Sequence, residues 1–375
     1  MKLHWIIPLT VDATFQFTSK NEMARSFRSC GHDITTTVAY VNDKTVMDGF
    51  THVDYVHVPA GSLFSKIRLH WKMLESTWKM NADVVMFGFQ SAHLIPLAWL
   101  FRCGRNRPKL VMDIRTVPVD VRKGIKGKLD LWRYRFSLYM ANWFCDGVTV
   151  ITPMLGDTVR PYLKRLKNKM GVWTSGVHLE HFERAGKDRR QELGIEGKQV
   201  LLYHGVLSPN RGLQNALRAF DSLKEKFPDL FFLFVGDGDG RIELEQLAKD
   251  LGLNDRVIFT GKVPYVQVSE YIRSANMAIL PFPDITWWAV SSPIKLMEYL
   301  ATGISIIATN IDAHRWVVEK TGGAILAVDD QPASLAKSIE AVLVEGVEAA
   351  APEKLEATIS WNKQAKELLR FVEGL

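Results

Sequence analysis

Two short segments combine a helix-capping residue with a cation, a pairing typical of phosphate binding. The tetrapeptides Ser208-Pro209-Asn210-Arg211 and Ser292-Pro293-Ile294-Lys295 each follow a strand-like run and precede a helical one. Serine favours the N-cap of a helix and proline its first turn, so the basic residue falls where the helix dipole disfavours a cation. An anion bound at each helix end would offset that cost. The alternative is two ordinary caps with solvated basic side chains.

The second segment also carries an acid at a spacing that suits a nucleotide. If Ser292 caps the helix, Lys295 and Glu298 are three residues apart and share one face. The helix end and Lys295 would hold an anion, and Glu298 could accept hydrogen bonds from a vicinal diol such as a ribose. A ligand with both groups is a nucleotide diphosphate. The alternative is a local Lys–Glu ion pair of little energetic consequence.

A glycine-rich turn, Val235-Gly236-Asp237-Gly238, directly follows another strand-like run. Glycines there allow the backbone to approach a ligand closely, although Gly-Asp turns are also common at strand ends. The segment has no Gly-Lys-Ser/Thr of a P-loop. The acid that a dinucleotide fingerprint needs about 20 residues further on would be Asp255, which lies in a turn.

Strand-like and helical runs alternate along the whole chain, and this predicts the elements that hold these residues. The buried-strand runs are 3–8, 33–40, 84–87, 110–114 and 147–151, then 200–204, 231–235, 257–260, 277–280 and 305–309. Such alternation predicts parallel sheets, and the two series predict two doubly wound α/β domains. Ligands bind beyond the carboxyl ends of the strands in such folds, so we expect the site in a cleft between the domains.

The domain boundaries follow from composition. The charged stretch 183–198 is the predicted linker, and a Pro- and acid-containing stretch precedes a final helix over 359–372. We therefore expect a first domain over 1–190, a second over 191–355 and a C-terminal helical segment over 356–375. In the final helix one face is apolar and could dock on another part of the chain; it carries Trp361, Ala365, Leu368, Leu369 and Val372.

Charge is unevenly distributed. Residues 1–195 hold 29 basic and 17 acidic side chains, whereas the remainder is net acidic. Within this basic half, the stretch 120–144 mixes Lys and Arg with Trp, Tyr and Phe at helical spacing, a composition that suits a bilayer interface. The alternatives are a helix whose aromatic side chains pack on the sheet, or nucleic-acid binding. No nucleic-acid motif accompanies the stretch, so we expect no nucleic-acid partner.

The remaining composition favours a cytoplasmic protein. Three widely spaced cysteines predict neither a disulfide framework nor a zinc site. The first ten residues resemble a strand more than a signal peptide. The longest apolar stretch, 84–101, is interrupted by polar residues and predicts strand, loop and helix. Any membrane contact would be peripheral.

An ordered series of motifs covers some 140 residues of the second half. It comprises Gly205, Arg211-Gly212-Leu213, Val235-Gly236-Asp237-Gly238, Val257-Ile258-Phe259-Thr260-Gly261-Lys262-Val263-Pro264, Ala275-Asn276-Met277, Leu280-Pro281 and the segment from Ser292 to Gly303. This series resembles the family-four retaining glycosyltransferases, whose fold is GT-B. In that fold two Rossmann-like domains face a central cleft, and a C-terminal helix returns to the first domain.

The resemblance implies roles on the nucleotide-sugar side. Arg211 and Lys295 would bind the diphosphate and stabilise the leaving group. Glu298 matches the second glutamate of the family's Glu-x7-Glu motif and would bind the ribose. The backbone around Lys262 and Val263 would hold the base. The other residues expected beside the nucleotide sugar are Gly205, Gly236, Gly238, Ser291, Ser292 and Pro293.

The chain departs from the family pattern in three places. Val290 stands where the first glutamate of Glu-x7-Glu is expected, and Val206 stands near the position of an expected arginine. The segment Thr10 to Ser19 replaces the usual glycine-rich loop. Six residues are candidates for the acceptor side of the cleft: Thr14, Phe15, Gln16, His93, Asp113 and Arg115.

The resemblance implies transfer from a nucleotide-diphosphate sugar, with UDP preferred and GDP as the alternative. The acceptor would be a saccharide or a lipid-linked saccharide in cell-surface glycan synthesis. No metal or other cofactor is expected, because basic residues would take the place of the metal. Two other functions stay open: a nucleotide-sugar epimerase of the same fold, and a non-catalytic nucleotide-sugar-binding protein.

Overall fold

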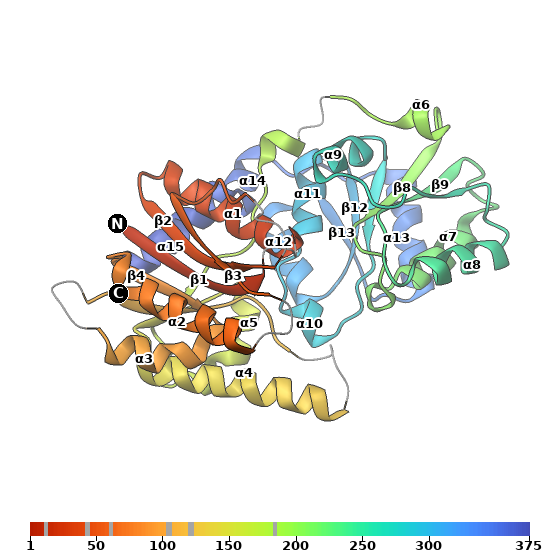
Figure 1. Cartoon of the computed structure of the whole chain (residues 1–375). Helices are drawn as coiled ribbons and strands as arrows, with labels where there is room; N and C mark the ends of the chain where they lie inside the picture. The colour runs from red at the N-terminus through yellow and green to blue at the C-terminus, as the bar shows by residue number, and fades with distance from the viewer. Residues whose placement is uncertain (11–13, 42–45, 60–62, 103–106, 119–123, 183–185) are drawn as a thin grey trace. The chain divides into compact units, whose positions relative to one another are not determined.

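Runs of β-branched and aromatic residues build two parallel sheets, each at the centre of its own compact unit (Figure 1). The computed structural model describes residues 1–10, 14–41, 46–59, 63–102, 107–118, 124–182 and 186–375. The first unit comprises residues 1–176, 290–292 and 361–375, and the second comprises residues 177–289 and 293–360. The first unit therefore ends before the boundary expected at residue 190.

The sheet of the first unit has seven parallel strands in the order β3-β2-β1-β4-β5-β6-β7. They are β1 (Lys2–Thr10), β2 (Asp33–Tyr40), β3 (His52–His57), β4 (Val84–Gly88), β5 (Lys109–Ile114), β6 (Gly147–Val150) and β7 (Met170–Val172). The strand order reverses between the neighbours β1 and β4. The carboxyl ends of these strands mark the switch point at which doubly wound sheets bind ligands.

Side chains of β1 alternate between two hydrophobic cores, one on each face of the sheet. Trp5 and its neighbours at even spacing join a core with α1 (Thr14–Ser29) and the C-terminal helix α15 (Trp361–Glu373). Ile6 joins the core on the other face. Four helices contribute to that second core: α2 (Leu63–Lys79), α3 (Ile95–Leu100), α4 (Gly124–Phe144) and α5 (Pro153–Val159).

The helix α15 belongs to the first unit by its contacts and packs beside α1 (Figure 1). Its predicted apolar face is buried in full, from Trp361 to Val372. Two glycines make the close approach possible. An added Cβ would lie 2.4 Å from the Phe371 ring at Gly171 and 2.9 Å from Trp361 at Gly176. The expected return of the last helix to the first domain is confirmed. A preceding helix, α14 (Pro352–Ile359), stays in the second unit.

The sheet of the second unit has six parallel strands in the order β10-β9-β8-β11-β12-β13. They are β8 (Gln199–His204), β9 (Leu230–Val235), β10 (Val257–Phe259), β11 (Met277–Leu280), β12 (Ser305–Thr309) and β13 (Ala324–Ala327). The helices that follow these strands include α7 (Leu213–Leu223), α8 (Arg241–Asp250), α9 (Tyr265–Arg273), α10 (Thr286–Ala289), α11 (Ile294–Thr302), α12 (Asp312–Thr321) and α13 (Pro332–Glu345). The strand order reverses between β8 and β11.

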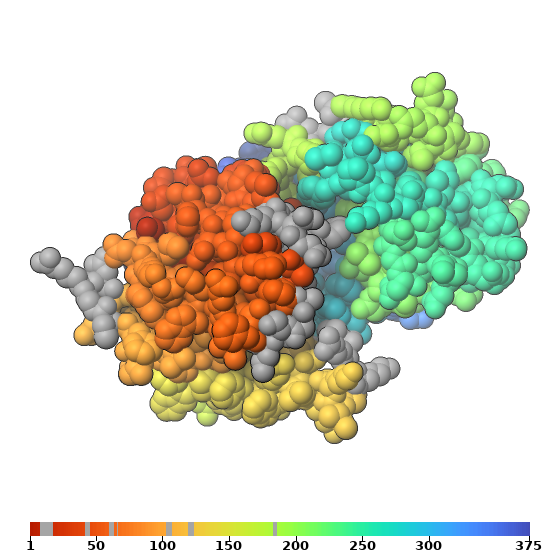
Figure 2. Space-filling view, in the orientation of Figure 1, coloured from red at the N-terminus to blue at the C-terminus, as the bar shows by residue number. Residues whose placement is uncertain are grey.

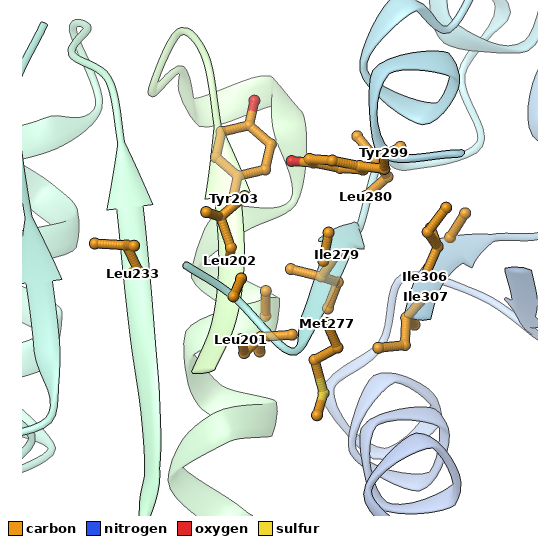
Figure 3. Close-up of a cluster of buried hydrophobic side chains, with 14 of the residues drawn as sticks. Leu201, Leu202, Tyr203, Leu233, Met277, Ile279, Leu280, Tyr299, Ile306 and Ile307 are labelled. Atoms are coloured by element: carbon orange, nitrogen blue, oxygen red, sulfur yellow. The ribbon is translucent and has the colours of Figure 1, made fainter. Parts of the chain in front are cut away.

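The core of the second unit supports the ends of its central strands. Aliphatic side chains of β8, β9, β11 and β12 fill it, and Figure 3 shows Tyr203 and Tyr299 at one end of this cluster. The Tyr299 hydroxyl accepts a hydrogen bond from the backbone N–H of His204 at 3.0 Å. The Tyr203 hydroxyl donates to the carbonyl of Val206 at 3.2 Å. Two buried rings thus fix the backbone where β8 ends.

The apolar stretch 84–101 forms the predicted strand, irregular segment and helix, namely β4, the 3-10 turn η1 (Phe89–Leu94) and α3. Among the described helices, none combines the length and the apolar character needed to cross a bilayer.

Candidate functional site

Three strand ends of the second unit come into direct backbone contact. Gly205 follows β8 and donates its N–H to the carbonyl of Val235 at 2.8 Å, while Gly236 bridges Gly261 after β10. An added Cβ on Gly236 would lie 2.0 Å from the carbonyl oxygen of Gly205, and one on Gly238 would lie 2.3 Å from the carbonyl oxygen of Leu207. The contacts of these predicted ligand-binding glycines are therefore with their own backbone. They bring the strand ends together.

In the guanidinium of Arg211, one nitrogen has a hydrogen-bond partner and a second, buried nitrogen has none among the described residues. It ends the 3-10 turn η4 (Pro209–Arg211) and donates from Nη1 to the Tyr203 hydroxyl at 3.2 Å. Its guanidinium carbon lies 5.0 Å from the ring centre of Trp288 and 5.4 Å from that of Phe282. The buried Nε has no hydrogen-bond partner among the described residues. Leaving a buried charged donor unpaired is costly, and an anionic ligand would satisfy it.

The two expected helix caps are wrong in detail. Ser208 makes no capping bond; its hydroxyl donates to the Asn210 side chain, and α7 begins only after Gly212. Pro293 takes the N-cap position of α11, and the Ser292 hydroxyl instead accepts the N–H of Ser175 at 3.2 Å. Pro209 begins the turn η4 and Pro293 is the N-cap of α11, but the serine before each proline makes another hydrogen bond instead of capping the helix. Lys295 nevertheless lies in the first turn of α11, and Arg211 lies two residues before α7 begins.

Lys295 packs over the end of β8. Gly205 has a φ of +114°, which favours glycine, and a Cβ added there would lie 2.3 Å from Cε of Lys295 and displace this side chain. Burial lowers the pKa of Lys295 to about 7, and the nearby charge of Arg211 acts in the same direction. Glu298 raises this pKa and only partly compensates. Two cations therefore influence each other at the end of one strand.

Glu298 lies one turn further along α11 and is almost fully buried. Its Oε1 accepts the Tyr265 hydroxyl at 3.0 Å. Its Oε2 lies 3.0 Å from Nε2 of His204, a close contact that is not aligned as a hydrogen bond. A carboxylate has about four acceptor positions, so Glu298 keeps acceptor capacity beyond Tyr265.

Sequence reasoning missed the aromatic and imidazole neighbours of Glu298. His181 stacks on Tyr265 with ring centres 5.9 Å apart, and its buried Nε2 has no hydrogen-bond partner among the described residues. Burial lowers the pKa of His181. The turn that carries His181, η3 (Leu179–Phe182), contacts α11, a long-range packing that no local pattern signals.

The remaining nucleotide-side candidates occupy distinct environments. Lys262 is exposed after β10, and Val263 is half-buried and packs on the core. Ser291 is half-buried and Pro293 is buried. Val290, which replaces the expected glutamate, is buried in the core of the first unit, and its carbonyl accepts the Thr152 hydroxyl at 2.6 Å. Val290 is thus a packing residue with no exposed group for a sugar.

A second charged cluster lies in the first unit, at the end of β5. Asp113 is buried and accepts the Thr149 hydroxyl at 2.8 Å, and burial raises its pKa. Arg115 lies 3.6 Å from the Trp173 ring centre and donates to the Trp173 carbonyl at 2.9 Å. Burial lowers its pKa to about 10. Asp113 is therefore a countercharge inside the sheet.

The third member of this cluster, Lys20 on α1, was not predicted from the sequence. Burial lowers its pKa to about 8; Asp113 raises the pKa and Arg115 lowers it. Its ammonium nitrogen lies 6.0 Å from the ring centre of Trp5. The residue directly follows the stretch Thr10 to Ser19, which holds three of the predicted acceptor-side residues. Lys20 lies near Arg115 and Asp113 because of the order of the strands in the sheet, which a local sequence pattern does not reveal.

The other acceptor-side candidates do not join the cluster. His93 is exposed on η1, and its ring packs edge-on against His70 of α2 with ring centres 4.6 Å apart. Thr14, Phe15 and Gln16 form the first turn of α1. Their side chains lie outside the described part of the structure.

Two surface hollows of the first unit lie elsewhere. One, of about 420 Å³, is lined by residues at the amino ends of strands, including Lys2 and Asp33. The other, of about 660 Å³, adjoins Cys30 and α15. Parallel sheets bind ligands at the opposite, carboxyl edge, so neither hollow is assigned to the site. In the described residues no three His, Cys, Asp or Glu side chains converge as metal ligands. The absence of a metal requirement stays a prediction.

Comparison with protein-family models matches residues 186–364 to the model described as "Glycosyl transferases group 1". Among curated relatives, 2-deoxystreptamine glucosyltransferase of Streptomyces kanamyceticus is 24% identical over 204 residues, covering 52% of this chain and 51% of the relative. Phosphatidyl-myo-inositol mannosyltransferase of Mycolicibacterium smegmatis is 30% identical over 183 residues, covering 48% and 45%. The chain thus spans about half the length of these relatives.

Among solved structures, HepE of Anabaena, crystallised with UDP and glucose, superposes with a TM-score of 0.75. The superposition covers 100% of both chains at 15% sequence identity. At this identity the likeness concerns the fold. The shared fold covers the first half of the chain as well as the second.

Proposed function

Because this chain belongs to the group 1 glycosyltransferases (family four, GT-B fold), we propose that it moves a sugar from a UDP-sugar, or alternatively a GDP-sugar, to an acceptor with retention of configuration. One observation carries the proposal. At the end of β8, two cations converge, and one of them keeps a buried, unpaired donor, Nε of Arg211. That arrangement suits a diphosphate.

The chemistry assigned to this site is leaving-group stabilisation. Negative charge develops on the β-phosphate as the sugar–phosphate bond breaks, and Arg211 and the protonated form of Lys295, which a bound diphosphate favours, would stabilise it. The approach of Lys295 to the strand end requires Gly205. The rigid strand end, fixed by Tyr203 and Tyr299, keeps both cations in position. The same two cations would make a metal ion unnecessary.

Glu298 would bind the ribose hydroxyls of the nucleotide. Its carboxylate is held by Tyr265, whose hydroxyl occupies one acceptor position. The backbone around Lys262 and Val263 would hold the base. Ser291, Ser292 and Pro293 would lie beside the β-phosphate and the sugar. With valine at 290, recognition of the sugar would fall to other groups.

The acceptor is proposed to bind to the first unit. Residues 1–195, which include the strands of the first unit, hold 29 basic and 17 acidic side chains. This excess of positive charge favours an acceptor with an anionic group, such as a lipid-linked saccharide. The similarity to a phosphatidyl-myo-inositol mannosyltransferase supports the same class. Peripheral residence on the cytoplasmic face of the membrane, in cell-surface glycan synthesis, completes the proposal.

A calorimetric screen of UDP- and GDP-sugars against the purified protein tests this function. We expect one nucleotide sugar to bind and Arg211→Ala to abolish its binding or turnover. Product analysis without an acceptor distinguishes an epimerase, which would convert the sugar, from a transferase, which would not. Binding without turnover of any sugar, in the presence of lipid-linked acceptors, would identify a non-catalytic module and reject the transferase.

A further inference from the structure

The outward face of α4 carries a continuous apolar stripe. Its members recur at alternating spacings of four and three residues, which place them on one side of a helix. They are Ile125, Leu129, Trp132, Phe136, Tyr139 and Trp143, and each is exposed, Ile125 by 86% and Trp143 by 67%. The stripe is roughly 27 Å long at 1.5 Å per residue. The helix packs on the first unit through other residues, Tyr134, Ser137, Leu138 and Ala141. The alternative that these aromatic side chains pack on the sheet is therefore wrong.

The helix α2, like α4, has one side that packs on the core and an apolar side that is exposed. Leu69, Met73 and Leu74 bury one side of it in the core. A second apolar stripe faces outward and comprises Phe64, Ile67, Trp71 and Trp78, with Phe64 exposed by 78% and Trp71 by 62%. Packing in the core explains the inward side chains of α2, whereas its outward apolar side chains lie outside the core.

The helix α3 connects the two stripes through ring contacts. Trp78 of α2 lies 5.9 Å from Phe101, directly after α3. Trp99 of α3 lies 5.6 Å from Phe144 at the end of α4. Both distances join ring centres. Figure 2 shows these segments, in orange and yellow, side by side on one surface of the first unit. We call this surface the α2–α3–α4 face. Exposed apolar patches of this extent mark interaction sites.

Positive charge surrounds the apolar residues. Together α2 and α4 hold eight Lys or Arg residues and two acids. One acid, Glu75, already pairs with Lys72 at 3.0 Å and with Lys79. The exposed cations include Arg68, Lys126, Lys128, Arg133 and Arg135. The partner of this face must therefore accept both apolar side chains and an excess of cations.

We propose that the α2–α3–α4 face docks on the surface of a bilayer rich in anionic lipid. Trp, Tyr, Phe and Leu would enter the headgroup region, and the flanking cations would contact lipid phosphates. A second copy of the chain fits less well, because a symmetric interface would place like charges opposite each other. Nucleic acid offers phosphates but no apolar phase for Ile125 and Leu129. The inference concerns a surface apart from the proposed site and stands independently of the transfer reaction.

Vesicle flotation tests the proposal without nucleotide or acceptor. We expect the protein to float with phosphatidylcholine vesicles that contain phosphatidylglycerol, and to dissociate as salt rises. The variant Trp132→Glu/Phe136→Glu should weaken this binding at least about ten-fold, because it removes two inserted rings and adds repulsive charge. The variant Lys128→Gln/Arg133→Gln should weaken it about five-fold for each charge, and only on anionic vesicles.

A matched control places the same charges elsewhere. Val328→Glu/Val344→Glu adds two acids at exposed apolar positions of the second unit, and it should float like the parent protein. All substituted side chains are exposed, so thermal unfolding should stay close to that of the parent. Failure of the parent protein to bind anionic vesicles at low salt would overturn the proposal. Equal losses in the control variant, or a dimer in solution that Trp132→Glu/Phe136→Glu dissolves, would also overturn it.

Discussion

Each unit places two cations and one carboxylate at the carboxyl ends of its strands, but the two clusters use their charges differently. In the second unit, Arg211 keeps a buried donor unpaired. In the first unit, Arg115 covers the Trp173 ring and bonds its carbonyl. The same residue types can therefore bind a ligand or stabilise their own unit. Unsatisfied groups distinguish the two cases better than charge does.

The carboxylates differ in the same way. Asp113 lies within β5 and accepts the Thr149 hydroxyl, so it compensates the surrounding cations from inside the sheet. Glu298 lies on a helix, is oriented by Tyr265, and retains acceptor capacity. The first arrangement stabilises the fold around a buried charge. The second presents an oriented acceptor to a ligand.

The largest expected effect separates the two arginines. Arg211→Ala should reduce kcat/KM by a factor of about 100 to 1000, because one preformed contact to the leaving group is lost, with only a small change in thermal stability. Arg115→Ala should mainly lower the free energy of unfolding, by about 2 kcal/mol, since it removes a stacked ring contact and a countercharge of Asp113. Steady-state transfer assays and chemical denaturation of both variants measure the contrast. Parallel losses of activity and stability in the two variants would abolish the distinction.

The pH dependence of nucleotide binding should depend on Lys295. In the ligand-free protein burial lowers its pKa to about 7, whereas a bound diphosphate favours the charged form and raises the pKa. The affinity is therefore highest below pH 7 and falls as the free amine forms. From about pH 6.5 to about pH 8.5 the fall should reach about twenty-fold if the bound form stays protonated. Titration calorimetry across this range measures it.

The matched variants for this test are Lys295→Arg and Lys295→Met. The arginine stays charged throughout the range, so its affinity should not change with pH; the methionine should bind weakly at every pH. The free energy of unfolding changes with pH in the opposite direction. The folded protein holds the Lys295 proton less tightly than the unfolded chain does, so the free energy of unfolding rises as the pH increases from about 7 towards the ordinary pKa of lysine. A parent-like pH profile in Lys295→Met would assign the titration to another group.

The sequence predicted the central strands of both sheets well and missed three others. The residue run 33–40 became β2 and 277–280 became β11, because fully buried strands are continuously apolar or β-branched. The missed strands β3, β7 and β13 are the edges of their sheets. An edge strand is buried less, and its composition carries less signal. His52–His57, for example, is mostly half-exposed.

The site was predicted through local spacing, which could identify residues but not their partners. The separation of Lys295 and Glu298 predicted that they share one helix, and both lie on α11. The contacts that orient them come from Gly205, Tyr265 and His204, which belong to other elements. The aromatic face of α4 shows the same limit. Its periodicity fixed which residues share a side, but only packing against the first unit determined which side faces outward.

The smallest expected effect concerns Glu298 and tests whether its role differs from that of Asp113. Glu298→Gln keeps the size of the side chain but replaces an ionised acceptor with a neutral amide, so hydrogen bonds to a ribose diol should weaken. We expect nucleotide affinity to fall about ten-fold, with the loss confined to ligands that carry an intact ribose; a 2'-deoxy nucleotide should bind both proteins more equally. Asp113→Asn is the matched change in the first unit and should leave nucleotide affinity unchanged while lowering stability. Unchanged affinity in Glu298→Gln would remove the ribose role, and its buried carboxylate would then be, like Asp113, a countercharge for its own unit.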